Sequence, residues 1–120
     1  MARDAALITT WGSTVPGREA KSLEVFMEFL TFFGKQAADG RCAEPEVWFN
    51  SDASEGMAIV RGKSDALLEI QETEGYEKLL SKGHMIVGDL KVHLWYGGAD
   101  EEIQRGTRLF AEAGSELGYI

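Results

Sequence analysis

The residue best suited to acid–base chemistry in this sequence is a histidine in the segment VHLWYGG, residues 92–98. If the segment is a β-strand, the alternation of side chains places His93 and Trp95 on one face together with Lys91. Histidine titrates near neutral pH, so an imidazole in an aromatic, partly polar hollow is a candidate general base. The favoured alternative is a histidine that lines an interface and bonds to a neighbouring group.

Other side chains are candidates for holding a ligand. Arg61 and Asn50 are candidates for stabilising an oxygen anion beside His93, although Arg61 is favoured as an ion-pair partner of Glu46 across a hairpin. The candidate ligand-binding residues are Trp11, Trp48, Trp95, Lys91 and Tyr76. The tryptophans equally suit the filling of a core or an interface. The ring of Tyr76 is alternatively expected under a helix, with its hydroxyl at the rim.

The sequence lacks the spacings that are typical of metal and cofactor sites. His84, which we expect in a loop, and His93 lie nine residues apart, and no H-x-x-x-H, C-x-x-C or facial-triad pattern occurs. Neither of the glycine-rich nucleotide-binding patterns occurs among the 14 glycines. We therefore expect no metal and no cofactor. Cys42, the single cysteine, is interpreted as a tolerated thiol in a connection rather than as a nucleophile.

Length and charge narrow the class of protein. A chain of 120 residues with 44% hydrophobic residues suits one globular domain, residues 1–120. Its 20 acidic and 12 basic residues give a net charge of -8, and no cluster of Lys and Arg occurs, so nucleic-acid binding is not expected. The apolar run near the N-terminus is too short for a membrane span or a signal peptide. With one cysteine, these features favour a cytoplasmic location.

The hydrophobic pattern predicts alternating strands and helices. Strands are expected over residues 5–12, 44–52, 55–63 and 84–98, and helices over 18–40, 63–83 and 99–118. Gly75 is expected to break the second helix, with Thr73 capping its restart and Gly83 ending it, and Ser64 or Asp65 is expected to cap its beginning. The order βαββαβ plus a helix predicts an α+β fold.

The expected α+β fold is ferredoxin-like, with a four-stranded antiparallel sheet and both main helices on one face. Residues 5–98 would form this core and residues 99–118 an additional helix. The other face then carries too many apolar and aromatic side chains for a solvated surface. Its expected members are Trp48, Asn50, Met57, Ile59, Arg61, Lys91, His93 and Trp95, with Leu7, Thr9 and Trp11 favoured over Ile8 and Thr10 from the first strand.

The helix expected over residues 18–40 is apolar on two sides. Leu23, Phe26, Met27, Leu30, Phe33 and Ala37 form one stripe at helical spacing. Phe29 and Phe32 lie roughly opposite this stripe, so a second element must cover them. The C-terminal helix is the expected cover, and the alternative is that the C-terminal helix reaches across to a second subunit.

The segments MAIVRGKSDALLEIQETEGYEKLL and VGDLKVHLWY resemble the dimeric α+β barrel superfamily of small bacterial proteins in their layout. In both, a strand runs into a capped helix that breaks and restarts before the last strand, and the resemblance covers residues 5–98. It implies a homodimer formed through the open sheet faces. It also implies a pocket, but no single reaction, because the superfamily includes monooxygenases, isomerases, haem-handling proteins and proteins without known activity.

Three functions follow as hypotheses from these observations. The first is a homodimer that binds a small, mostly apolar organic molecule in the barrel cavity, against Trp48, His93 and Trp95. The second is a cofactor-independent monooxygenase- or isomerase-like enzyme that uses His93 as its base. The third is a structural dimer without a ligand. The sequence does not decide whether the chain is an enzyme.

Overall fold

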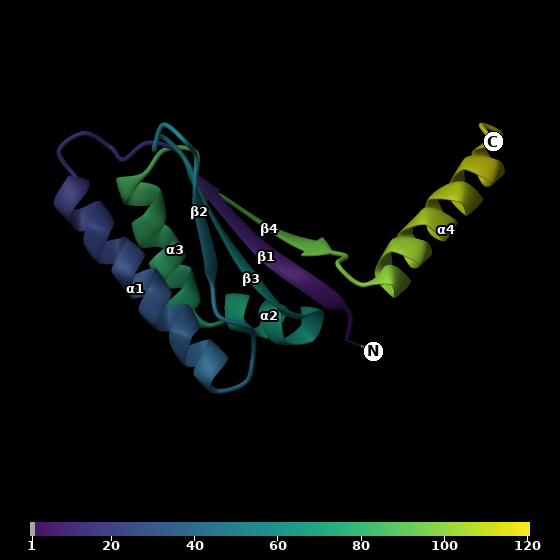
Figure 1. Cartoon of the computed structure of the whole chain (residues 1–120), viewed down its shortest axis with the longest axis horizontal. Helices are drawn as coiled ribbons and strands as arrows, with labels where there is room; N and C mark the ends of the chain where they lie inside the picture. The colour runs from purple at the N-terminus through teal and green to yellow at the C-terminus, as the bar shows by residue number, and fades with distance from the viewer. Residues whose placement is uncertain (1) are drawn as a thin grey trace.

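A four-stranded antiparallel sheet with helices along one side forms the body of the protein, as the computed structural model of residues 2–120 shows (Figure 1). In chain order the elements are β1 (Asp4–Trp11), α1 (Glu19–Ala38), β2 (Glu46–Phe49), β3 (Gly56–Lys63), α2 (Ser64–Gln71), α3 (Glu74–Ile86), β4 (Lys91–Tyr96) and α4 (Asp100–Leu117). The helices α1, α2 and α3 lie on one side of the sheet, whereas α4 projects from its end on the other side (Figure 1).

The sheet has the strand order β2-β3-β1-β4, with all neighbouring strands antiparallel. The first and third strands are therefore central, as two crossovers of the same hand require in a βαββαβ chain. The prediction of a ferredoxin-like α+β fold is confirmed. In the register of the central strand, Leu7 lies opposite Val60 on one side and Leu94 on the other.

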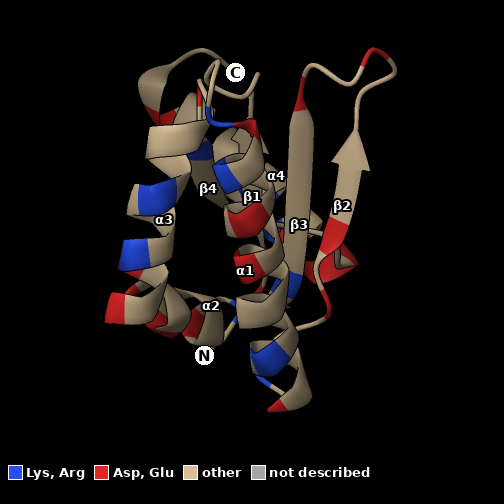
Figure 2. Ribbon diagram, turned by 90° about the vertical axis from the view of Figure 1, so that its left-hand side faces the viewer, with Lys and Arg blue, Asp and Glu red and all other residues tan. Residues whose placement is uncertain are grey.

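The hydrophobic core lies between the sheet and the three helices. Leu7 and Val60 from the sheet meet Phe33 of α1 and Leu67 and Ile70 of α2, and all five side chains are almost completely buried. The strand residues reach the core through period-2 alternation, and the helical residues through spacings of three and four. Across the outer surface of the helix layer, Lys82 of α3 donates to a carboxylate of α1, and Figure 2 shows basic and acidic residues interspersed there.

The buried side of α1 differs from the one expected from the sequence. Phe33 of the expected stripe is completely buried, and Phe29 from outside that stripe packs beside it with ring centroids 4.9 Å apart, whereas Leu23 and Met27 of the stripe are 64% and 53% exposed. The apolar residues of α1 cover so wide an arc that the pattern allowed two buried centres. In the structure, the side of α1 that faces the sheet is the one that carries Phe29 and Phe33.

The expectation that the C-terminal helix covers Phe29 and Phe32 is wrong. The ring of Phe32 lies 6.2 Å from that of Tyr76 on α3, measured between centroids, and both phenylalanines pack on the main core. Figure 1 shows α4 far from α1 and α3, and none of its residues is buried. These phenylalanines are therefore covered by the core and by α3, and not by α4.

The break between α2 and α3 forms as expected. Thr73 caps α3 by accepting a hydrogen bond from the backbone N–H of Tyr76 at 3.2 Å. The expected cap of α2 is wrong, because Ser64 is already helical and its hydroxyl accepts from the backbone N–H of Arg3 at 3.1 Å. The end of α3 was also misplaced, since the helix passes Gly83 and includes His84, which is exposed and not in a loop.

Shortening a side chain on each side of α1 tests which side of the helix stabilises the fold. We expect Phe33→Ala to lower the free energy of unfolding by about 3–5 kcal/mol, because it leaves a cavity among fully buried side chains. The matched truncation Leu23→Ala removes an exposed side chain and is expected to change it by about 0.5 kcal/mol or less. Urea denaturation of the two variants measures both values. Similar losses would contradict the observed orientation of α1.

Candidate functional site

The structure separates the candidate ligand-binding residues onto the two sides of the sheet. Thr9 is 7% exposed on the side of the helices, and Trp11 follows on the same side with its ring centroid 6.1 Å from that of Phe26 on α1. The placement of Trp11 on the open face is therefore wrong. Both faces of β1 carry apolar residues, so its alternation alone did not show which face meets the helices.

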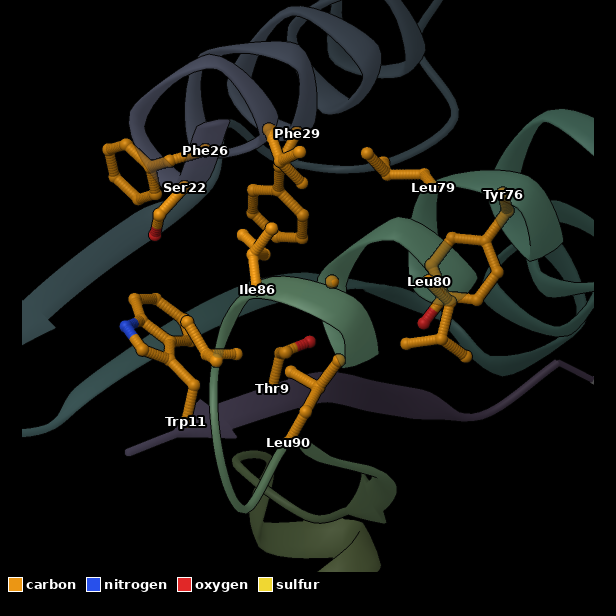
Figure 3. Close-up of a pocket in the computed structure, with 13 residues that line it drawn as sticks. Thr9, Trp11, Ser22, Phe26, Phe29, Tyr76, Leu79, Leu80, Ile86 and Leu90 are labelled. Atoms are coloured by element: carbon orange, nitrogen blue, oxygen red, sulfur yellow. The ribbon is translucent and has the colours of Figure 1, made fainter. Parts of the chain in front are cut away.

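A pocket lies between the sheet and the helices α1 and α3, and we call it the helix-side pocket (Figure 3). Its enclosed volume is about 80 Å³, more than a single water molecule requires, and the pocket is partly open to solvent, so a larger molecule can extend beyond it. It is lined by Thr9, Trp11, Ser22, Val25, Phe26, Phe29, Tyr76, Leu79, Leu80, Gly83, Ile86, Val87 and Leu90. Of the expected ligand-binding residues, it contains Trp11 and Tyr76.

The glycine opposite Trp11 gives its indole room to lie over the sheet. Gly56 pairs with Trp11 in the register of β1 and β3 and is itself buried. A Cβ atom on Gly56 would lie 2.4 Å from the indole ring, well inside van der Waals contact. The absence of a side chain at position 56 thus permits Trp11 to form the wall of the pocket.

Tyr76 supplies an unusual polar group to the helix-side pocket. The residue is only 4% exposed, and its hydroxyl has no hydrogen-bond partner among residues 2–120. Burial raises the pKa of Tyr76 to about 12, against a smaller lowering by the nearby Gln71 side chain, which does not reach hydrogen-bond geometry with the hydroxyl. The phenol is therefore neutral at physiological pH and suited to donate a hydrogen bond rather than to accept a proton from a substrate.

Two other hydroxyl groups border the helix-side pocket. The Ser22 oxygen lies 3.2 Å from the Thr14 hydroxyl, so these two groups satisfy each other. The Thr9 hydroxyl, in contrast, points toward the part of the pocket that Tyr76 lines (Figure 3). Among the described residues that line the pocket, none carries a charge or an imidazole. Its chemistry is therefore that of an apolar enclosure with neutral hydrogen-bonding groups.

The opposite side of the sheet is uncovered in the single chain, and we call it the open face. It consists of Ala6, Ile8, Thr10, Glu46, Trp48, Met57, Ile59, Arg61, Lys91, His93 and Trp95, which alternate with the core-facing residues of their strands. His93 forms a cross-strand row with Ile8 and Ile59, and its ring lies 6.1 Å from that of Trp95 between centroids. His93 and Trp95 thus share the face on which they were expected.

Three further candidate residues contact neighbouring groups, namely Arg61, Trp48 and Asn50. Arg61 forms the expected ion pair with Glu46, and this guanidinium lowers the pKa of the Glu46 carboxyl. The indole N–H of Trp48 donates to the same carboxyl at 3.1 Å. Asn50 lies in the turn after β2, where its side-chain oxygen accepts from the backbone N–H of Glu55. Arg61 is thus held in an ion pair, and Asn50 lies in a turn outside the strands.

Several lining residues of the helix-side pocket were missed from the sequence. Thr9 was assigned to the other face, and Leu80 resembles an ordinary core residue of an amphipathic helix. Phe29 carried the one available signal, because a second aromatic side on α1 requires a partner beyond a single sheet. A cavity is the space that packed side chains leave, so no local pattern specifies it.

Two further classes of site are not found within residues 2–120. No group of three or more His, Cys, Asp and Glu side chains is placed to hold a metal ion there. No helix in this part of the chain is long and apolar enough to cross a membrane. Cys42 is half-buried, and burial raises the pKa of its thiol, which disfavours the reactive thiolate.

Proteins of known structure share this arrangement of sheet and helices. They have the same ferredoxin-like α+β fold as this chain. SnoaB from Streptomyces nogalater, a cofactor-independent oxygenase, is similar with a TM-score of 0.64 and 16% identity, over 82% of this chain and 96% of SnoaB. Rv0793 from Mycobacterium tuberculosis is similar with a TM-score of 0.65 and 15% identity, over 81% of this chain and 97% of its own.

A third similar structure is a putative antibiotic biosynthesis monooxygenase from Caulobacter crescentus, with a TM-score of 0.62 and 13% identity over 82% of this chain and 92% of that protein. No family model matches the sequence, and no curated protein matches it. At these identities the likeness establishes the fold and leaves the reaction open.

The buried phenol of Tyr76 has a measurable alkaline signature. Its pKa of about 12 exceeds the ordinary value of 10.0, so its stabilising contribution is complete below about pH 10 and is lost as pH rises toward 12. We expect a late phase in the 295-nm titration of the three tyrosines, and this phase should be absent in Tyr76→Phe. The variant should also lose less stability between pH 10 and 12 than the parent. An unchanged late phase would contradict the burial of Tyr76.

Proposed function

We propose that this chain binds a small, mostly apolar organic molecule in the helix-side pocket. The observation that carries the proposal is the buried Tyr76 hydroxyl, which has no partner within residues 2–120 and borders an otherwise apolar cavity. A buried donor without an acceptor costs free energy in the empty protein. A ligand that supplies the acceptor would remove this cost while it fills the cavity.

The lining of the pocket defines the chemistry of this ligand. Trp11, Phe26 and Phe29 offer aromatic surfaces, which favour a flat or aromatic body. Tyr76 stays protonated at neutral pH, so the ligand needs a hydrogen-bond acceptor such as a carbonyl oxygen. Because no charged residue is among the described lining residues, a carboxylate or an ammonium group would lose its hydration without compensation.

Binding is tested with acetophenone and with ethylbenzene, its matched hydrocarbon without the acceptor oxygen. We expect acetophenone to raise the Tm of the parent and to bind more tightly than ethylbenzene, by calorimetric titration. Tyr76→Phe should lower the affinity for acetophenone roughly tenfold, the equivalent of one hydrogen bond of about 1.4 kcal/mol, and leave ethylbenzene unaffected.

The location of the bound probe is tested by filling the pocket. Leu80→Trp adds bulk to a lining residue and should abolish binding of both probes. Leu68→Trp makes the same change at an exposed position of α2 and should leave binding unchanged. Equal binding by the parent and Leu80→Trp would place the ligand elsewhere and overturn the proposal.

We propose further that two chains associate through their open faces. Trp48 and Trp95 are 55% and 56% exposed there, beside Met57, Ile59 and Ile8, which is an unfavourable arrangement for a surface in water. Face-to-face packing of two such sheets would bury these side chains in a layer about 10 Å thick. The exposed imidazole of His93 would then lie inside the dimer.

The dimer is tested by sedimentation equilibrium at micromolar concentration. We expect the parent to sediment as a dimer and Trp95→Asp to shift the equilibrium toward monomer, because the variant would bury an unpaired carboxylate between the sheets. Leu68→Asp, a matched change on α2, should leave the parent's dissociation constant unchanged. A monomeric parent would contradict the role assigned to the open face.

A cofactor-independent oxygenase is the second candidate function, favoured by the similarity of fold to SnoaB. In the helix-side pocket, the neutral Tyr76 phenol would stabilise negative charge on a substrate oxygen. The candidate base His93 lies on the other side of the sheet and would serve only a substrate held between two open faces. Comparison of ligand turnover by His93→Ala and by the parent distinguishes these two locations, because equal turnover excludes His93 as the base.

A further inference from the structure

Helix α4 carries an apolar stripe that its own chain leaves in solvent. Ile103, Phe110 and Leu117 recur along one side of the helix and are 57%, 79% and 71% exposed. The C-terminus extends this stripe, because the chain turns at Gly118 and brings Ile120 against Gly114. An amphipathic helix of 18 residues whose apolar side faces water is only marginally stable by itself.

The base of α4 is nevertheless held in one direction. The guanidinium of Arg3 donates to both carboxylate oxygens of Glu102, at 2.9 and 2.6 Å, and lies 3.8 Å from the centre of the Tyr96 ring. Arg3 is itself anchored, since its backbone carbonyl accepts from the N–H of Ser64 at 2.7 Å. These contacts join the start of β1, the start of α2 and the end of β4 to the first turn of α4.

Helix α4 points away from the hydrophobic core of its own chain. Figure 1 shows α4 projecting from the end of the sheet on the side opposite α1 and α3, which is the side of the open face. Trp95, near the end of β4, is the open-face residue closest to α4 in the chain and is 56% exposed. The open face and helix α4 therefore lie on the same side of the sheet.

We propose that α4 packs its apolar stripe against a second copy of this chain, as an arm exchanged between the two protomers of the homodimer. This inference rests on the homodimer proposed above and adds α4 to its interface. A partner sheet that covers the open face would stand beside α4, and the two-fold symmetry of a homodimer would make the exchange reciprocal.

The area that a stable dimer needs supports this assignment. Four strands spaced about 4.8 Å apart and about six residues long present roughly 400 Å² of projected face per protomer. Stable interfaces bury about 800 Å² of accessible surface per partner, so a large contact area is needed. A helix of this length adds a projected strip of roughly 27 Å by 10 Å, and its receiving surface on the partner adds an equal strip, so the exchange roughly doubles the projected contact area of each protomer.

The charge of α4 argues against a membrane as the occupant of this stripe. The helix carries five acidic residues and two arginines, and three of the acids, at positions 100–102, form its first turn. An anionic lipid surface repels such a helix, whereas membrane-surface helices are typically rich in Lys and Arg. A second copy of the chain offers apolar surface without that repulsion.

The inference is tested with a charge placed on each side of α4 in the full chain. Phe110→Asp interrupts the stripe, and Gln104→Asp places the same charge on the polar side. We expect Phe110→Asp to raise the dimer dissociation constant at least 100-fold by sedimentation equilibrium, and Gln104→Asp to change it less than threefold. Far-UV circular dichroism confirms that both variants keep the fold of the core.

Hydrogen exchange of the parent provides the second measurement. We expect the amides of residues 103–117 to be protected at concentrations where the protein is dimeric and unprotected where it is monomeric. Protection that persists in the monomer would show that α4 folds back on its own chain, and it would overturn the inference.

The outcomes separate this inference from the homodimer itself. If Trp95→Asp dissociates the dimer and Phe110→Asp does not, the open faces form the interface without α4, and only the arm exchange is refuted. If the parent is monomeric at all concentrations, both proposals fail. Liposome binding by the parent that Phe110→Asp abolishes would assign the stripe to a membrane instead and refute the exchange.

Discussion

A sheet with helices on one face only is the constraint on which the rest of this structure depends. The central strand β1 lies between two antiparallel neighbours, so each of its side chains points either into the core or away from the helices. Leu7, held between Val60 and Leu94, sets this alternation for all four strands. The pairing of the strands thus determines on which side of the sheet each candidate residue of a strand lies.

The two sides of the sheet consequently have different chemistry. The covered side encloses a neutral pocket within a single chain, in which Tyr76 retains an unsatisfied hydroxyl. The uncovered side presents His93 and tryptophans, but its ionic groups neutralise one another where Arg61 meets Glu46. A ligand site of one protomer and a contact surface for another can therefore occupy opposite sides of the same strands. The proposals for the pocket and for the dimer depend on this separation.

Much of the fold was predictable because local signals agreed with one another. The alternation of strands and helices led to the correct topology, and Thr73 marked the restart of α3 because a hydroxyl caps a helix where it begins. The Arg61–Glu46 pair followed from the proximity of two strands in a hairpin. The candidate site was less predictable, since Trp11 belongs to a strand whose two faces are both apolar. Its side of the sheet depends on the register with β3 and β4, which is a long-range property.

The sequence by itself determined the elements, their order and the existence of more apolar surface than one chain can cover. Those properties depend on period, composition and capping, which act over a few residues. Only the tertiary structure decided that α3 covers Phe29 and Phe32, that Trp11 and Tyr76 border the same cavity, and that α4 projects away from the core. Each of these outcomes depends on which apolar surface packs against which other one. An amphipathic pattern shows that a surface is to be buried but not what covers it, so the packing of the whole chain decides the pairing.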